Sequence, residues 1–398
     1  MKKVELLAPA GDLERLKIAI LYGANAVFCG GKQFSLRAKA NNFSIDDLKE
    51  AVKFANKHKA KVHVTVNIVP EDFDMKTLDE YLLSLSDAGV HAIIVSSIYI
   101  MKRAKELNCK FEVHVSTQQS IANHKAAEFF KQTVNVNRVV LARELNIDEI
   151  KEVKEKAKMP IEAFIHGGMC SSYSGRCTLS NSMANRDANK GGCAHSCRWT
   201  YKLMKDNKVI GNTNFIIASC DLMSIEYIPS LLKANVDSFK IEGRMKSVHY
   251  IATVVNAYRR IIDEYYKTGE LTNDRIAYYK KEIKKAENRI TYTGFLNSKM
   301  KNEALLLNTG VENPTQAFIA LVVKEKDVDG YSLIEVRNHF EDGCKAECFM
   351  PSGETINITM KNLYDLDGNK VDVARHPKQI LKVKFKQDLP LNTFIRKR

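Results

Sequence analysis

The sequence has no long apolar run. No stretch approaches the roughly 18 apolar residues that a helix needs to span a bilayer, so we expect no membrane segment. The first residues, MKKVELLAPAGDLERL, include two lysines but lack the apolar core of a signal peptide. These absences predict a cytoplasmic location, where stable disulfides are rare and clustered cysteines are more often metal ligands.

Several short catalytic motifs are also missing. The sequence contains no GxSxG, the turn that exposes a hydrolase serine, and no HExxH, the zinc-protease signature. No GxGxxG follows the first expected strand, which argues against a dinucleotide-binding fold. A cysteine peptidase would need one activated thiol beside a histidine; Cys193 and His195 are close in sequence, so this alternative stays open.

Positive charge is in excess. The chain has 61 Lys and Arg against 47 Asp and Glu, a net charge of +14. A basic surface of this size suits a polyanion such as RNA, although a lysine-rich proteome would give the same balance. A non-catalytic RNA-binding module would need stacking aromatics in the basic regions; Tyr278 and Tyr292 are available, but their spacing also suits helix packing.

The first 165 residues repeat one pattern, in which a short β-branched run is followed by an amphipathic helix. Helices are expected to begin behind the capping residues Asp12, Ser44 and Asn146. Eight strand–helix units predict an α/β fold, a (β/α)8 TIM-type barrel over residues 1–270, with an open doubly wound sheet as the alternative. The expected strands are residues 4–7, 26–29, 62–66, 92–95, 111–115, 138–141, 161–165 and 238–241.

The pattern changes at two places. A polar, cysteine-rich insertion at 166–222 follows the seventh strand, which places it on the carboxyl-terminal face where barrel enzymes carry their chemistry. After a basic helical connector at 271–304, short alternating runs separated by turn residues predict a small C-terminal antiparallel β-barrel domain at 305–398.

Four of the nine cysteines lie within the insertion, among glycines and polar residues that bury little apolar surface. Such a segment needs another source of order, and clustered thiols indicate a metal centre. Four thiolates are the usual complement of an iron–sulfur cluster. Zinc sites usually contain a C-x2-4-C pair, which the last two cysteines of the segment alone supply, so zinc remains the alternative.

The segments EAFIHGGMC (162–170) and FKIEGRMKS (239–247), together with LLAPAG (6–11) and HVSTQ (114–118), resemble the signature of the collagenase-like peptidase family U32. The resemblance covers roughly residues 4–300. Better-understood members are similar to oxygen-independent RNA hydroxylases that carry a [4Fe–4S] cluster. The length of this chain resembles the branch that forms 5-hydroxyuridine at the tRNA wobble position, with prephenate as the hydroxyl donor.

The resemblance carries further implications. It assigns the cluster ligands to Cys170, Cys177, Cys193 and Cys197, and related branches can recruit a ligand at the position of Cys220. Other branches hydroxylate a ribosomal RNA cytidine, which is a second possible reaction, and collagenase-like peptidase activity is a third. The implied partners are tRNA and a small dicarboxylate, and a paralogous protein is a possible further partner.

Polar residues near the expected strand ends are the candidates for chemistry, because strand ends converge on one mouth in a barrel. Arginine binds carboxylates in a bidentate manner, and histidine transfers protons near neutral pH. A structural salt bridge is the alternative for each charged residue. The expected substrate-binding residues are Arg143, Arg244, Gln118 and Ser116, and the expected catalytic residues are His114, His166, Glu162 and Glu242.

Overall fold

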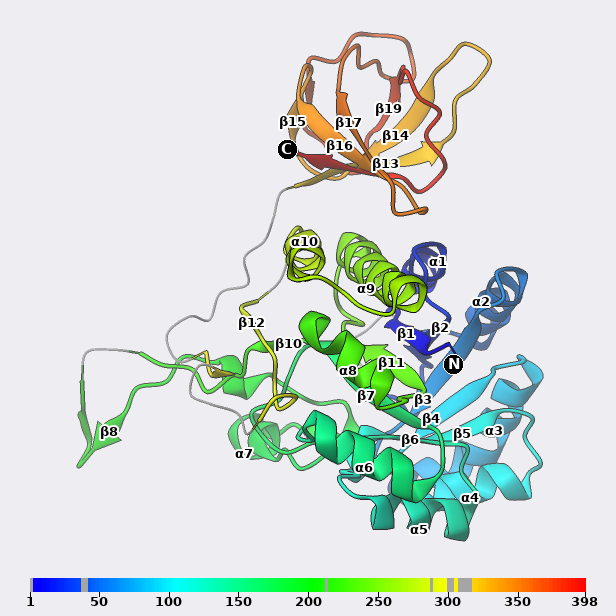
Figure 1. Ribbon diagram of the computed structural model, residues 1–398, viewed down its shortest axis with the longest axis vertical. Coiled ribbons are helices and arrows are strands. Elements are labelled where there is room, and N and C mark those ends of the chain that lie inside the picture. Colours follow the sequence, from blue (N-terminus) through cyan, green and yellow to red (C-terminus); the bar gives the residue numbers. More distant parts are fainter. Residues whose placement is uncertain (1–2, 37–41, 212–213, 287–288, 299–303, 307–316) are drawn as a thin grey trace.

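A computed structural model describes residues 3–36, 42–211, 214–286, 289–298, 304–306 and 317–398. Its larger part is a closed barrel of eight parallel strands surrounded by helices (Figure 1). Pairing of β11 with both β1 and β7 closes the barrel, so the prediction of a (β/α)8 barrel is confirmed. The strands are β1 (Glu5–Pro9), β2 (Ala26–Gly30), β3 (Lys61–Val66), β4 (Ala92–Val95), β5 (Glu112–Val115), β6 (Arg138–Val140), β7 (Ile161–Gly167) and β11 (Ser238–Ile241).

Helices follow the strands and bury their apolar faces against them. Asp12, Ser44 and Asn146 each accept a hydrogen bond from a backbone N–H in the first turn, so the three predicted caps are confirmed. No helix in the described ranges is long and apolar enough to cross a membrane. The helices are α1 (Leu13–Leu21), α2 (Ile45–Lys57), α3 (Leu78–Asp87), α4 (Ile98–Glu106), α5 (His124–Val134), α6 (Ile147–Ala157), α8 (Ile228–Lys233), α9 (Val248–Thr268) and α10 (Asn273–Ile283).

The segment between β7 and α8 leaves the barrel and returns to it. It contains the short helix α7 (Leu179–Ala184), a two-stranded hairpin of β8 (Met204–Lys205) and β9 (Lys208–Val209), and β10 (Asp221–Met223). Strand β10 pairs antiparallel with the end of β7, and β12 (Thr291–Tyr292) pairs with β10. Part of the expected connector, residues 287–288 and 299–303, lies outside the described residues.

The C-terminal domain is antiparallel, as predicted, but its closure as a barrel is not supported by its pairings. Within the described residues, its main sheet runs β17-β16-β20-β13-β14-β19 and keeps two edges. Between β14 and β16, the short strand β15 pairs with β18 in a separate two-stranded sheet. The strands are β13 (Phe318–Lys324), β14 (Ser332–Val336), β15 (Phe340–Glu341), β16 (Lys345–Phe349), β17 (Thr355–Thr359), β18 (Val373–Ala374), β19 (Ile380–Val383) and β20 (Phe394–Lys397).

The small domain rests on the outside of the barrel, against α1 and α9 (Figure 1). A shared apolar cluster joins Ile18 and Ala252 on these helices to Phe318 and Phe394 on the small sheet. The hydroxyl of Tyr22 donates to the carbonyl of Phe349 at 2.8 Å. The two parts are therefore packed as one body across a buried contact, away from the carboxyl ends of the barrel strands.

Candidate active site

A cavity of approximately 490 Å³ opens at the carboxyl ends of the barrel strands. Its floor includes Thr65 and Phe164 on β3 and β7, and its walls come from the residues that follow β5, β6, β7 and β11. Parallel strands bring these loops together at one end of the barrel, which is where barrel enzymes bind their substrates. The predicted site residues that line the cavity are Ser116, Gln118, Arg143, Glu242, Arg244, Cys170, Cys177, Cys193 and Cys197.

The four cysteines of the insertion form one wall of this cavity, although 27 positions separate the first from the last. All nine cysteines of the chain are free thiols. Burial raises the pKa of the Cys197 thiol; Arg198 opposes this effect, and the thiols of Cys170, Cys193 and Cys177 add to it. The electrostatic influence of the other three thiols shows that the insertion brings the set together.

Four cysteine thiols are ligands that either a zinc ion or an iron–sulfur cluster can use. A single zinc ion would hold four sulfur atoms at about 2.3 Å. A four-iron cluster is larger than one ion and is held by thiolates at its corners. Four thiols around one cavity suit such a group by number and chemistry.

A half-buried carboxylate holds the first cysteine loop against the barrel. Glu144 accepts hydrogen bonds from the backbone N–H and the hydroxyl of Ser174, each at 2.9 Å. Ser120 donates to the carbonyl of Ser174 at 2.5 Å. Gly175 has φ +74°, and a Cβ there would lie 2.2 Å from the carbonyl oxygen of Gln118. Glycine is therefore required where this loop crosses the β5 end of the barrel.

The second half of the insertion is fastened to the loop after β3. The ammonium of Lys190 pairs with Glu71 at 2.6 Å, and the N–H of Val69 donates to the carbonyl of Asn189 at 3.0 Å. On its other side, the N–H of Ile217 donates to the carbonyl of Cys197 at 3.0 Å. These contacts position the second pair of cysteines over the barrel mouth.

Three cations face the cavity from below the cysteines. The guanidinium of Arg143 lies 3.9 Å from the centre of the Phe164 ring and donates to the carbonyl of Gly168 at 2.6 Å. Arg244 donates to Ser35 at 3.0 Å, and the Lys240 ammonium lies 4.4 Å from the centre of the Phe28 ring. Each guanidinium is a planar group with five N–H donors, the geometry that suits a carboxylate.

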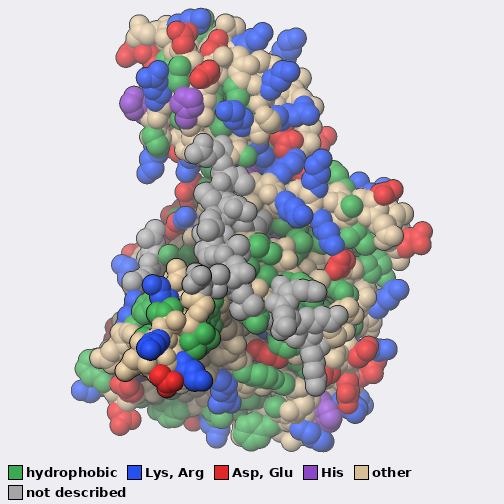
Figure 2. All heavy atoms as spheres, turned by 90° about the vertical axis from the view of Figure 1, so that its left-hand side faces the viewer, with side chains coloured by type: hydrophobic (Ala, Val, Ile, Leu, Met, Phe, Trp, Pro, Cys, Tyr) green, Lys and Arg blue, Asp and Glu red, His purple; other side chains and the backbone are tan. Residues whose placement is uncertain are grey.

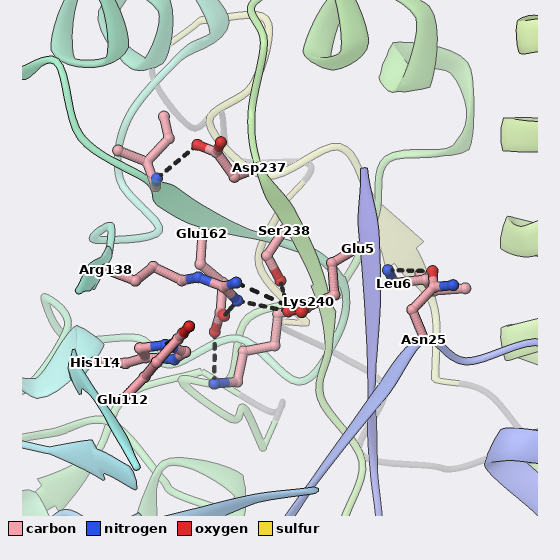
Figure 3. Close-up of polar contacts among 11 residues, drawn as sticks. Glu5, Leu6, Asn25, Glu112, His114, Arg138, Glu162, Asp237, Ser238 and Lys240 are labelled. Atoms are coloured by element: carbon pink, nitrogen blue, oxygen red, sulfur yellow. Dashed lines mark hydrogen bonds and ion pairs between the residues drawn. The ribbon is translucent and has the colours of Figure 1, made fainter. Parts of the chain in front are cut away.

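Glu162 and His114 were expected at the mouth, and this placement is wrong. Figure 3 shows both among charged side chains inside the barrel, where they are fully buried and do not line the cavity. Glu162 accepts from Arg138 at 3.1 Å and from Lys240 at 2.8 Å. Burial opposes its ionisation, but Lys240 and Arg138 lower its pKa to about 2. The error comes from position along the strand. Glu162 is the second residue of β7, so it lies far from the carboxyl end that forms the mouth.

His114 points into the same network. Its Nε2 lies 2.9 Å from Glu112, and burial lowers its pKa well below the ordinary value. The neighbouring His63 is also fully buried, and burial lowers its pKa to about 4. Both rings are therefore neutral near pH 7 and are not in the cavity wall. Proton transfer to a substrate in the cavity by His114 would need a relay.

The expected position of His166 is also wrong. Although it lies near the end of β7, its side chain faces α9 and its Nδ1 lies 3.2 Å from the hydroxyl of Tyr258. Simple alternation would put His166 on the same face as Glu162 and Phe164, but the register between β7 and β11 shifts at this point, and the side chain turns toward Tyr258 instead. The Tyr258 hydroxyl also donates to the carbonyl of Ile165 at 3.0 Å. His166 thus contributes to packing behind the cavity.

Three residues that line the cavity, Lys240, Glu144 and Ser174, escaped the sequence reasoning. Lys240 lies within a buried strand, and only its charge in an otherwise apolar run could have singled it out. Glu144 and Ser174 are 30 positions apart, so no local pattern could have paired them. Cys220, a possible substitute ligand, does not line the cavity; it packs in an apolar cluster with Ile216.

The fold and the cavity define the class of protein: a (β/α)8 barrel whose carboxyl-terminal mouth is lined by four thiols and several cations. The chain belongs to peptidase family U32. The sequence profile of that family matches residues 11–305, and the profile of the family's C-terminal domain matches residues 314–396.

Three of the curated relatives carry different names. The chain is 43% identical to "tRNA hydroxylation protein P1" of Bacillus subtilis over 100% of its own length and 95% of that protein. It is 37% identical to a 23S rRNA 5-hydroxycytidine synthase of Escherichia coli, over 66% of this chain and 39% of that one. It is 33% identical to "Collagenase" of Porphyromonas gingivalis, over 73% of each chain.

Proposed function

We propose that this chain hydroxylates a pyrimidine in RNA, with the wobble uridine of tRNA as the target and 5-hydroxyuridine as the product. The supporting observation is full-length similarity to a protein named for tRNA hydroxylation, combined with a cationic cavity at the barrel mouth. The relative named for ribosomal RNA is matched over 39% of its length, so the tRNA target is the better supported.

The cavity wall formed by Cys170, Cys177, Cys193 and Cys197 is the proposed seat of a [4Fe–4S] cluster. Such a cluster supplies a store for single electrons and a fixed charged surface beside the substrate. Arg198, which lines the cavity beside Cys197, reduces the negative charge that four thiolates would place there. The contacts between Glu144 and Ser174 keep the first two thiols in place when the cavity is entered.

The floor of the cavity is the proposed site of the hydroxyl donor. A small dicarboxylate, prephenate in this proposal, needs two cationic contacts and an apolar surface between them. Arg143 and Arg244 supply the charges, and the rings of Phe28 and Phe164 supply the surface. Lys240 adds a third cation at the base, where Glu162 holds it in place. Binding there would exclude water from the floor while the nucleotide enters from the mouth.

Nucleoside mass spectrometry of tRNA and ribosomal RNA from a deletion strain tests this proposal. We expect 5-hydroxyuridine-derived nucleosides of tRNA to disappear in a strain that also lacks any paralogue, and to return with a plasmid copy. Loss of hydroxycytidine from ribosomal RNA instead would support the second target. Unchanged nucleosides together with gelatin cleavage by the purified chain would refute RNA hydroxylation and support a peptidase.

The cluster is tested separately by substitution of one thiol. Cys170→Ser should remove the broad visible absorbance and most of the iron of the anaerobically purified protein, because a cluster usually needs four thiolates. Hydroxylation should fall to background in the same preparation. Cys344→Ser, in the small domain, is the matched control and should retain colour and iron. Full iron content in the Cys170 variant would contradict this ligand set.

A further inference from the structure

A hairpin projects from the cysteine insertion and has no packed face. Its strands β8 and β9 pair through Met204 with Val209 and Lys205 with Lys208, and Figure 1 shows β8 extending away from the barrel. Every residue from 202 to 210 is exposed. We call residues 199–210 the arm. A two-stranded hairpin alone is marginally stable in water, so an unpacked arm of this kind suits contact with a partner.

The arm is nevertheless formed by specific contacts. Asp206 and Asn207 have φ of +49° and +61°, the pair of left-handed residues that a tight hairpin turn requires. At its base, the backbone groups of Tyr201 and Phe215 exchange hydrogen bonds of 2.8 and 3.0 Å. The Tyr201 hydroxyl donates to the carbonyl of Ser196 at 2.6 Å. The base of the arm is therefore tied to the wall that holds Cys197.

The chemistry of the arm suits a polyanion. It carries Lys202, Lys205 and Lys208, and Asp206 is its single acidic residue. All three lysines are exposed. Trp199, the one tryptophan of the chain, follows the cavity-lining Arg198 and has 42% of its surface exposed. Figure 2, drawn from the side on which β8 projects, shows Lys and Arg side chains on both the barrel and the small domain.

We infer that the arm is an RNA-binding element: its lysines contact backbone phosphates, and Trp199 stacks on an unpaired base next to the nucleotide that enters the cavity. Stacking on an aromatic ring and phosphate contacts with lysines are the two ways in which proteins hold unpaired RNA. The inference rests on the proposed function for the identity of the RNA, but the contact itself can be measured without catalysis.

Salt dependence of binding tests the lysines. An unmodified tRNA transcript is bound to the purified protein over a range of salt concentrations. Replacing Lys202, Lys205 and Lys208 by glutamine should reduce the slope of log affinity against log salt by about 2 to 3, one contact per lysine. The matched control replaces the exposed Lys53, Lys57 and Lys59, at and after the end of α2, and should leave the slope unchanged.

Fluorescence tests the stacking. Because Trp199 is the one tryptophan, tRNA binding should change its emission without interference, and Trp199→Ala should weaken binding about fivefold or more. Trp199→Phe should restore part of the affinity. Phe129→Ala, which removes a similarly exposed ring (48%) from α5, is the control and should bind tRNA normally.

Unchanged emission and an unchanged salt slope would overturn the inference. So would arm variants that alter the oligomeric state but bind tRNA normally, because the arm would then contact a protein. Failure of the proposed function would look different. The arm variants would still weaken tRNA binding, but nucleoside analysis would show no hydroxylation. Conversely, the arm variants could hydroxylate tRNA normally with an unchanged Michaelis constant. That result would refute RNA binding by the arm and leave the proposed function standing.

Discussion

At the scale of single residues, the charges that line the cavity differ from those buried below it. Arg138 donates to Glu5 at 2.5 Å and to Glu162 at 3.1 Å, and it lies below the cavity. Arg143 donates to Gly168, Arg244 donates to Ser35 and Asn42, and both line the cavity. Exposure to the cavity, rather than charge, therefore separates a candidate binding residue from a structural one.

Arg244→Ala should mainly weaken binding of the donor. Loss of a charge-assisted hydrogen bond costs about 1.5–3 kcal/mol, so the Michaelis constant for a dicarboxylate should rise roughly 10- to 150-fold. The turnover number should change less, because the variant keeps the thiol wall. Steady-state kinetics at varied donor concentration measures both. Arg103→Ala, on the outer face of α4, is the control. An unchanged Michaelis constant would remove Arg244 from the donor site.

At the scale of elements, the insertion is ordered by contacts to the barrel rather than by secondary structure of its own. Glu144, which follows β6, and the loop after β3 hold its two halves. A long polar loop buries too little apolar surface to order itself, so such fixed points replace a core. The cysteine positions depend on these distant partners.

Glu144→Gln should loosen the first cysteine loop without unfolding the barrel. An amide supplies one acceptor oxygen where the carboxylate supplies two, so a donor of Ser174 would lose its partner. Such a loss costs about 1–3 kcal/mol, enough to raise local opening roughly tenfold. Hydrogen exchange of residues 170–177 measures this effect. Glu128→Gln on α5 should leave exchange there unchanged; equal protection in both variants would show that Glu144 does not anchor the loop.

At the scale of the whole molecule, the small domain depends on a buried ion cluster as well as on apolar contact. Arg396 donates to Thr253 of α9 at 2.9 Å and to Glu347 at 3.2 Å, and its guanidinium lies 3.8 Å from the centre of the Phe349 ring. Lys285 pairs with the same Glu347 at 2.8 Å. These contacts join β20 and β16 to the helices of the barrel.

Arg396→Ala should therefore destabilise the whole chain. Removing Arg396 takes away one of the two cations of Glu347, together with the hydrogen bond to Thr253 and the contact with the Phe349 ring; breaking a buried pair typically costs about 3–5 kcal/mol. Urea unfolding followed by circular dichroism measures the free energy of unfolding. Lys156→Ala, which removes an exposed pair on α6, should have little effect. Similar unfolding curves for the two variants would mean that the cluster does not hold the domains together.

The barrel network predicts loss of stability in acid. The folded-state pKa is about 4 for His63 and about 2 for Glu5 and Glu162, each below its ordinary value. Unfolding therefore takes up protons, and stability is lost as the pH falls, first from about 6.5 to 4 and then from about 4.5 to 2. Above about pH 7, these groups should leave the free energy of unfolding unchanged.

Glu162→Gln tests how much of this acid-induced loss of stability comes from the Glu162 carboxylate. The variant should lose about 3–5 kcal/mol at pH 7, because Arg138 and Lys240 keep their buried charge, and its stability should fall less steeply below pH 4.5. Chemical unfolding at a series of pH values measures this difference. Glu155→Gln, on an exposed part of α6, should follow the wild-type curve. Parallel acid curves for wild type and Glu162→Gln would exclude the proposed coupling.

The sequence alone determined the barrel, because each strand–helix unit repeats a local pattern of β-branched runs, caps and amphipathic helices. It also located the cysteine wall, since an insertion after the seventh strand must lie at the mouth. Only the tertiary structure decided which face each polar side chain takes: His166 lies behind β7, and Glu162 lies below the cavity. Position in a strand and the partners across the barrel set those directions, and neither is encoded within a short stretch of sequence.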